Sequence, residues 1–173
     1  MHGSGVVAIL ERGVDDRGVL TQRYGSDALD ASLLLAVLTR FLPPDDPRIR
    51  ATVMAIAEEL TEDGLVLRYR VEETDDGLAG EEGTFTICSF WLVSALVEIG
   101  EISRARHLCE RLLSFASPLH LYAEEIEPRT GRHLGNFPQA FTHLALINAV
   151  VHVIRAEEEA DSSGIFQPAN APM

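Results

Sequence analysis

The sequence predicts an all-α protein with about five helices in an inner and an outer layer. Helical segments that are apolar on nearly every side alternate with amphipathic ones, as in a helical toroid or solenoid. Segments with the alternation typical of strands are almost absent, and no repeat of fixed period is found. At 173 residues, 46% of them apolar, the chain has the size and the apolar content of one folded domain.

The first two predicted helices are separated by a proline-rich break. Residues 1–26 are rich in turn-forming residues and are predicted to be loop. Asp27 can cap a helix over residues 28–42, which is apolar on most of its surface and should be buried. The second helix, residues 47–60, has a proline in its first turn and one apolar face, so we expect it on the outer surface.

The third and fourth helices follow an acidic, glycine-rich loop, residues 72–83. Residues 84–99 are apolar on nearly every side and contain the only tryptophan, Trp91, which we expect to lie in the core. Residues 102–115 are amphipathic, with charged side chains opposite the apolar face. A buried helix and an outer helix are therefore predicted again.

The fifth helix follows the loop of residues 118–137. Asn136 is the expected cap of this helix, and Pro138 lies in its first turn. The apolar pattern ends in a run of charged residues. Residues 161–173 are polar and contain proline, so we predict a disordered tail behind a single domain of residues 1–160.

Composition and charge disfavour several classes of function. The formal net charge of −13 argues against nucleic acid and anionic membranes as partners. The two cysteines show no zinc-ligand spacing, and glycine-rich phosphate loops are absent, so we expect no metal ion and no cofactor. No apolar run is long enough to span a bilayer, and no signal peptide is recognised. We therefore expect a soluble, cytoplasmic protein.

The loop of residues 121–136 holds the first candidate for chemistry. Glu124 and Glu125 are adjacent carboxylates between two apolar helices, and Pro128 and Gly131 turn the loop around them. Such a setting can present an acid or a base to a ligand. From these residues alone, a solvated turn remains the alternative.

A second candidate is the arginine and tyrosine pair Arg68–Tyr69. Sugar sites commonly combine arginine with aromatic rings, because sugars carry hydroxyl groups at their edges and C–H groups on their faces. The alternative is a surface arginine pair, Arg68 and Arg70, that balances the nearby Glu72 and Glu73. Asp30 could also reach a pocket from the start of the first helix.

Six motifs follow one another along the chain. They are Tyr24–Ser32, Phe41–Pro47, Asp63–Val66 followed by Arg68–Tyr69, Glu82–Val93, Leu121–Glu125 and Leu134–Phe141. Together they resemble the C-terminal part of bacterial glycoside hydrolase family 15, which contains glucoamylase-like and trehalase-like enzymes. The resemblance extends from about residue 9 to residue 155.

The resemblance implies part of an (α/α)6 toroid, the six-hairpin glycosidase fold, and hydrolysis of α-glucosidic bonds with inversion. Inverting enzymes need a general acid for the leaving oxygen and a general base for water, with carboxyl groups about 6.5–9.5 Å apart. The family's base lies at the position of Glu124, with Glu125 as the second choice. Its arginine–tyrosine pair, which contacts the non-reducing glucose, matches Arg68 and Tyr69, and Glu82 lies in a loop near the sugar.

One part of the family pattern is missing from this sequence. The family's general acid follows an upstream inner helix in a Gly-Ile-Trp-Glu-like motif, and no such motif occurs here. We therefore expect a fragment that needs an upstream polypeptide and is weakly active alone, because acid–base assistance contributes roughly 10²–10⁴-fold per group. Helices 28–42 and 84–99 are expected to lose neighbours and to expose apolar faces. The alternative function is a non-catalytic helical module that binds sugars or proteins.

Overall fold

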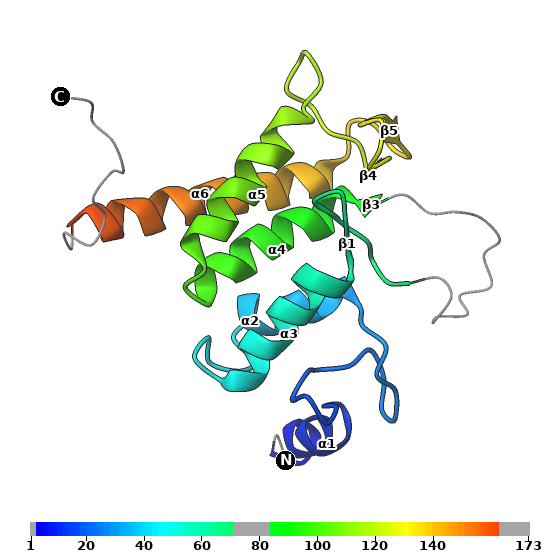
Figure 1. The fold of residues 1–173 in the computed structure, drawn as a ribbon, viewed down its shortest axis with the longest axis vertical. Helices are drawn as coiled ribbons and strands as arrows, with labels where there is room; N and C mark the ends of the chain where they lie inside the picture. Colours follow the sequence, from blue (N-terminus) through cyan, green and yellow to red (C-terminus); the bar gives the residue numbers. More distant parts are fainter. Residues whose placement is uncertain (1–2, 71–83, 163–173) are drawn as a thin grey trace.

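The computed structural model describes residues 3–70 and 84–162, and within them the protein is predominantly helical (Figure 1). The helices are α1 (Gly3–Arg12), the 3-10 turn η1 (Ala31–Leu34), α2 (Leu35–Leu38), α3 (Pro47–Glu59), α4 (Thr86–Glu98), α5 (Ile102–Ser114) and α6 (Ala140–Ser162). The predicted all-α class is therefore confirmed. The predicted helices over residues 47–60, 84–99 and 102–115 correspond to α3, α4 and α5.

Helix α4 forms the centre of the molecule. It packs against α5 and α6 on one side and against α2 and α3 on the other (Figure 1). Nine of its 13 residues are buried, as expected for a helix that is apolar on nearly every side. The amphipathic helices α3 and α5 bury one face each, which agrees with their predicted outer position.

Two small sheets join the helices, although the sequence shows almost no strand pattern. β1 (Thr61–Glu62) and β2 (Leu65–Val66) form a hairpin. β3 (Thr84–Phe85), β4 (Glu125–Ile126) and β5 (His133–Leu134) form an antiparallel sheet in the order β3–β4–β5. Each strand has only two residues, which is too short for an alternating pattern to be recognised. The second sheet lies at the N-terminal ends of α4 and α6 (Figure 1).

The predicted helix over residues 28–42 is wrong in its start and its length. The chain stays extended as far as Asp30, whose carboxylate accepts a hydrogen bond of 2.7 Å from Ser32 N. The next backbone amide, that of Ala31, donates to Arg68 O at 2.7 Å. Asp30 is therefore the cap, three residues later than predicted, and only η1 and α2 follow it.

The N-terminal segment also differs from the prediction. Residues 1–26 are predicted to be loop, but they contain α1. Gly3 and Gly5 disfavour a helix, and the apolar run that follows them is too short to indicate one. The predicted tail, residues 161–173, lies outside the described residues except for its first two, which end α6.

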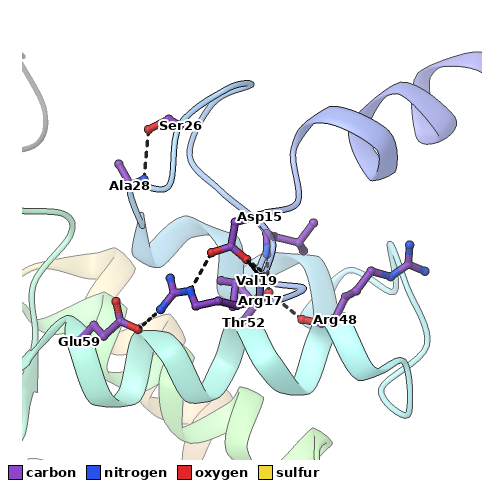
Figure 2. Close-up of polar contacts among 9 residues, drawn as sticks. Asp15, Arg17, Val19, Ser26, Ala28, Arg48, Thr52 and Glu59 are labelled. Atoms are coloured by element: carbon purple, nitrogen blue, oxygen red, sulfur yellow. Dashed lines mark hydrogen bonds and ion pairs between the residues drawn. The ribbon is translucent and has the colours of Figure 1, made fainter.

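The segment after α1 is attached to α3 by polar contacts. The Arg17 guanidinium lies between the carboxylates of Asp15 and Glu59, at 2.8 and 2.6 Å (Figure 2). Both ion pairs are partly exposed, so their contribution to stability is small. A buried hydrogen bond of 2.9 Å from Leu20 N to Thr52 Oγ1 satisfies a backbone donor in the interior. This contact connects the segment to α3 in the interior.

The exposed apolar faces are not on the predicted helices. Helix α4 is enclosed by its neighbours, so the expectation for residues 84–99 is wrong, and no large apolar side chain of residues 28–42 is exposed either. The exposed side chains gather on one face of α6 instead: Phe141, Leu144, Ile147, Val151 and Ile154. The opposite face of α6 carries small residues such as Ala145 and Ala149, which are buried where α6 packs on α4. We call the exposed row the α6 stripe.

Candidate functional site

A pocket of about 240 Å³ lies beside the sheet at the N-terminal ends of α4 and α6. Its walls are formed by Asp30, Ser32, Arg68, Phe85, Ile87, Cys88, Trp91, Glu124, Gln139, Phe141 and Thr142. Three larger cavities, of about 490, 500 and 380 Å³, lie near α1, near α3 and at the C-terminal end of α6. None of them is lined by Glu124 or Arg68, so the smaller pocket is the candidate site.

The pocket brings together two of the predicted residues from different loops. Glu124 lies immediately before β4, and Arg68 lies after β2. Asp30, which could reach a pocket according to the sequence, enters it from the start of η1. Trp91 lines the pocket as well as packing against the core, so its prediction as a core residue is incomplete. A helix that is apolar all round does not reveal which of its residues borders a cavity.

The backbone ahead of Glu124 is held by the start of α6. Tyr122 O accepts a hydrogen bond of 2.9 Å from Gln139 N, and Ala123 O accepts one of 3.3 Å from the Thr142 hydroxyl. Tyr122 N donates to His143 Nε2 at 3.3 Å. Because Nε2 accepts, the ring proton of His143 lies on Nδ1, which is 2.7 Å from Gln139 O.

The side chain of Tyr122 anchors the same loop in the core. Its hydroxyl donates to Leu112 O at 3.1 Å, and its ring meets Phe90 edge-on with 5.6 Å between centroids. Tyr122 is only 1% exposed, and burial raises the pKa of its hydroxyl to about 12. The residue is therefore a structural support and not a proton carrier.

The backbone of Glu124 is fixed on both sides. Its amide donates to Asn136 O at 2.9 Å, and its carbonyl accepts from Thr86 N, at the start of α4, at 2.9 Å. The carboxylate is held as well, because Oε2 accepts hydrogen bonds from Asn136 N at 3.2 Å and from Asn136 Nδ2 at 2.9 Å. A half-buried acid is thus presented to the pocket in one orientation.

The role of Asn136 differs from the prediction. Asn136 is expected to cap the last helix, but α6 begins at Ala140, and the Gln139 side-chain oxygen accepts a hydrogen bond of 3.4 Å from Phe141 N. Asn136 instead faces Glu124 across the hairpin. The sequence carries no signal for this pairing, because it depends on how the two ends of the loop meet.

Arg68 offers hydrogen-bond donors to the pocket. Its guanidinium carbon lies 5.4 Å from the centre of the Tyr69 ring and 6.0 Å from that of Phe85. Among the described residues, the guanidinium forms no ion pair. Glu72 and Glu73, the alternative partners considered from the sequence, lie outside the described residues.

Tyr69 and Glu125, two further predicted residues, do not line the pocket. Tyr69 is 9% exposed and lies beneath the Arg68 guanidinium. Glu125 pairs with Phe85 and Leu134 in the sheet and is absent from the pocket wall. Glu82 lies outside the described residues.

The pocket offers chemistry that suits a small, neutral, hydroxyl-rich ligand. The fixed carboxylate of Glu124 can accept a proton, the Arg68 guanidinium can donate to hydroxyls, and the ring of Trp91 can face C–H groups. Burial raises the pKa of the Cys88 thiol to about 12, so this wall of the pocket is uncharged. In residues 3–70 and 84–162, no three His, Cys, Asp or Glu side chains are grouped to hold a metal ion.

The family pattern of "Glycosyl hydrolases family 15" matches residues 6–151. The chain is 94% identical over 165 residues to a trehalase of Mycolicibacterium smegmatis, and 88% identical over 165 residues to a trehalase of Mycobacterium tuberculosis. Both matches cover 95% of this chain but 25% and 24% of the relatives. A trehalase of Thermoplasma volcanium is 42% identical over 141 residues, which are 80% of this chain and 22% of the relative. The chain therefore spans about a quarter of the length of the curated relatives.

Solved glycosidases share the fold. A wild-type glycosidase superposes with a TM-score of 0.71 at 24% identity, over 86% of this chain and 42% of that chain. A glycosidase variant in complex with glucose superposes with the same TM-score at 23% identity, with the same coverage. The described helices thus form part of an (α/α)6 toroid, as the resemblance implies.

Proposed function

Because the chain belongs to glycosyl hydrolases family 15, we propose that it supplies the general base of a trehalose-hydrolysing enzyme. The observation that supports this most directly is the pocket itself. Glu124 and Arg68, which come from different loops, line one cavity of about 240 Å³. Pockets for drug-sized ligands measure about 300–1,000 Å³, so the smaller volume of this cavity suits a single sugar ring.

Glu124 is the proposed general base. In inverting hydrolysis, one carboxylate takes a proton from water while a carboxylic acid on the opposite face of the sugar protonates the leaving oxygen. A base acts best when its orientation is set before the substrate binds. The three hydrogen bonds that join Glu124 to Asn136 support this role. Glu125 lies in the sheet and is the weaker choice.

Arg68 is the proposed sugar contact. Its guanidinium has several donors in one plane, which can serve two neighbouring hydroxyls of a glucose ring. Tyr69 supports the guanidinium from below and acts through it. Glu82 remains a prediction from the family resemblance.

Trehalose is the proposed substrate. The support is that relatives with 94% and 88% identity are both trehalases. At 94% identity over 95% of this chain, most residues that line the pocket are expected to be shared with that relative. Selection of trehalose over a maltooligosaccharide is proposed to depend on loops around the pocket that the upstream segment contributes.

An upstream polypeptide is proposed to complete the site. The family's acid motif does not occur in this sequence, and the matched relatives extend well beyond the chain. The α6 stripe supports the same proposal, because Phe141, Leu144 and Ile147 are more than half exposed, at 67%, 58% and 58%. A row of large apolar side chains of this kind is usually covered by another element.

The sequence predicts that neither nucleic acid nor a membrane is a partner, and both expectations are compatible with a sugar substrate. The net charge of −13 disfavours nucleic acid, and a small neutral sugar needs no basic surface. Across the described residues, none of the helices has the length and apolar character needed to cross a membrane. A cytoplasmic location remains a prediction.

Glucose release from trehalose tests the proposal. The chain is assayed alone and joined behind the upstream part of a full-length trehalase relative, each with and without Glu124→Gln. We expect turnover only in the joined protein, and its loss by at least about 10²-fold in the variant. Fast turnover by the chain alone would contradict the need for an upstream segment. Glucose binding without turnover in the joined protein would favour the non-catalytic sugar-binding module.

A further inference from the structure

We propose that Asn136 is a positioning residue that orients the Glu124 carboxylate so that Oε1 is the oxygen that takes the proton from water. The inference rests on the proposed role of Glu124 as the base. Asn136 itself touches neither sugar nor water in this account. It acts only through Glu124.

Three hydrogen bonds join the two residues. Glu124 N donates to Asn136 O at 2.9 Å, which aligns the two backbones. Asn136 N and Asn136 Nδ2 both donate to Glu124 Oε2, at 3.2 and 2.9 Å. Within the described part of the chain, no hydrogen bond to Oε1 is found. One carboxylate oxygen is thus occupied and the other is open.

This arrangement removes the freedom that a glutamate carboxylate normally has. The last torsion of a glutamate side chain is broad and roughly two-fold, so in solution the two oxygens exchange places easily. Here rotation out of the observed plane would break both hydrogen bonds on Oε2. The carboxylate plane is therefore fixed, with one oxygen held by Asn136 and the other, here Oε1, left for water.

Gly135 makes the approach possible. It has φ of 69°, and an added Cβ would lie 2.9 Å from Glu124 Oε2 and 3.1 Å from Glu124 Cβ. Only a residue without a side chain lets the Asn136 amide come this close to the carboxylate. The Gly135–Asn136 pair therefore works as one unit on Glu124.

The chemical step can be written with this assignment. A proton of the water moves to Glu124 Oε1 while the water oxygen bonds to the anomeric carbon. The glycosidic C–O bond breaks, its electron pair stays on the leaving oxygen, and a carboxylic acid of the upstream segment protonates that oxygen. Oε2 keeps both hydrogen bonds to Asn136 throughout, and release of the Oε1 proton to solvent after product leaves restores the base in its starting orientation.

Two substitutions distinguish orientation from fold support. Asn136→Ala removes the Nδ2 donor but keeps the backbone bonds. We expect kcat to fall about 10- to 100-fold, because displacement of a reacting group by about 1 Å can cost that much. The KM should stay within about twofold, since the sugar contacts of Arg68 are untouched. Asn136 is exposed, so the melting temperature should change little.

Asn136→Asp keeps the shape but places a carboxylate at hydrogen-bond distance from Glu124. Two carboxylates this close share a proton, which blocks the base. We expect a lower kcat than in the alanine variant, with a rise in kcat as the pH increases and the shared proton is lost. The other charged groups that line the pocket, Arg68 and Asp30, are the same in both variants, so the difference comes from residue 136.

The experiment measures kcat, KM, the pH profile and the melting temperature of the chain joined to the upstream part of a trehalase relative. Arg129→Ala, in the same hairpin and 86% exposed, is the control and should retain full activity. If Glu124→Gln is inactive but both Asn136 variants keep the parent kcat, the positioning role of Asn136 is overturned and Glu124 remains the proposed base. A fully active Glu124→Gln protein would overturn the proposed base. Loss of folding in both Asn136 variants would also contradict the inference, since it assigns Asn136 no part in stability.

Discussion

Replacing Gly135 with alanine should displace the Glu124 carboxylate at a modest cost in stability. The φ of 69° at Gly135 is a left-handed conformation, which costs other residues about 1–2 kcal/mol. The new Cβ would also lie 2.9 Å from Glu124 Oε2, closer than carbon and oxygen can approach. Because a side-chain end moves more easily than backbone, the contact is relieved by a shift of the carboxylate.

The expected magnitudes separate the two effects. The conformational cost of about 1–2 kcal/mol corresponds to a fall in melting temperature of about 2–8 °C for a domain of this size. The displaced carboxylate should reduce kcat for trehalose by about 10²-fold. Thermal unfolding is followed by circular dichroism, and kcat is measured by glucose release from the chain joined to its upstream partner.

Gly100→Ala is the matched control. Gly100 has φ of 82°, and an added Cβ would meet nothing within 4 Å. This variant has the same conformational cost, so its melting temperature should fall by a similar amount. Its kcat should remain within about twofold of the parent. Equal activities of the Gly135 and Gly100 variants would refute the claim that Gly135 maintains the position of Glu124.

Three further predictions follow from the pocket and the α6 stripe. Arg68→Lys keeps the charge but loses the planar set of donors, so kcat/KM for trehalose should fall about 10- to 100-fold in steady-state assays, and an unchanged value would remove Arg68 from the sugar site. Because burial raises the pKa of Cys88 to about 12, its thiol should react slowly with a disulfide reagent at pH 8 in the folded chain and rapidly in urea, and fast reaction of the folded chain would contradict its burial. Ile147→Glu should weaken binding of the upstream segment at least about tenfold by calorimetry without lowering the melting temperature of the isolated chain, because Ile147 is 58% exposed there.

Helices with a clear pattern and a clear cap could be predicted from the sequence. Asp46 accepts a hydrogen bond from Arg48 N at the start of α3, and Pro47 occupies the first helical position, as the pattern indicates. Residues 28–42 are apolar on most of their surface, but only Leu35–Leu38 form an α-helix there, after the 3-10 turn Ala31–Leu34. There the hydrogen bond from Ala31 N to Arg68 O holds the chain extended, and such a contact between distant segments leaves no local signal.

The candidate site could likewise be predicted only where local motifs indicate it. Glu124 and Arg68 were recognisable from motifs, and they do line one pocket. Trp91 and Asn136 received other roles in the sequence prediction, because a residue's neighbours across a hairpin or a cavity depend on the complete fold. The exposed face of α6 was missed for a similar reason, since its pattern is apolar all round and does not reveal which side is covered within this chain.

The most direct test of the account is the effect of Glu124→Gln on the chain joined to its upstream partner. The substitution keeps the shape of the side chain and removes its ability to take a proton. We predict that trehalose hydrolysis falls by at least about 10²-fold, while glucose binding measured by calorimetry stays within about twofold. Trehalose hydrolysis at the parent rate would contradict the assignment of Glu124 as the base.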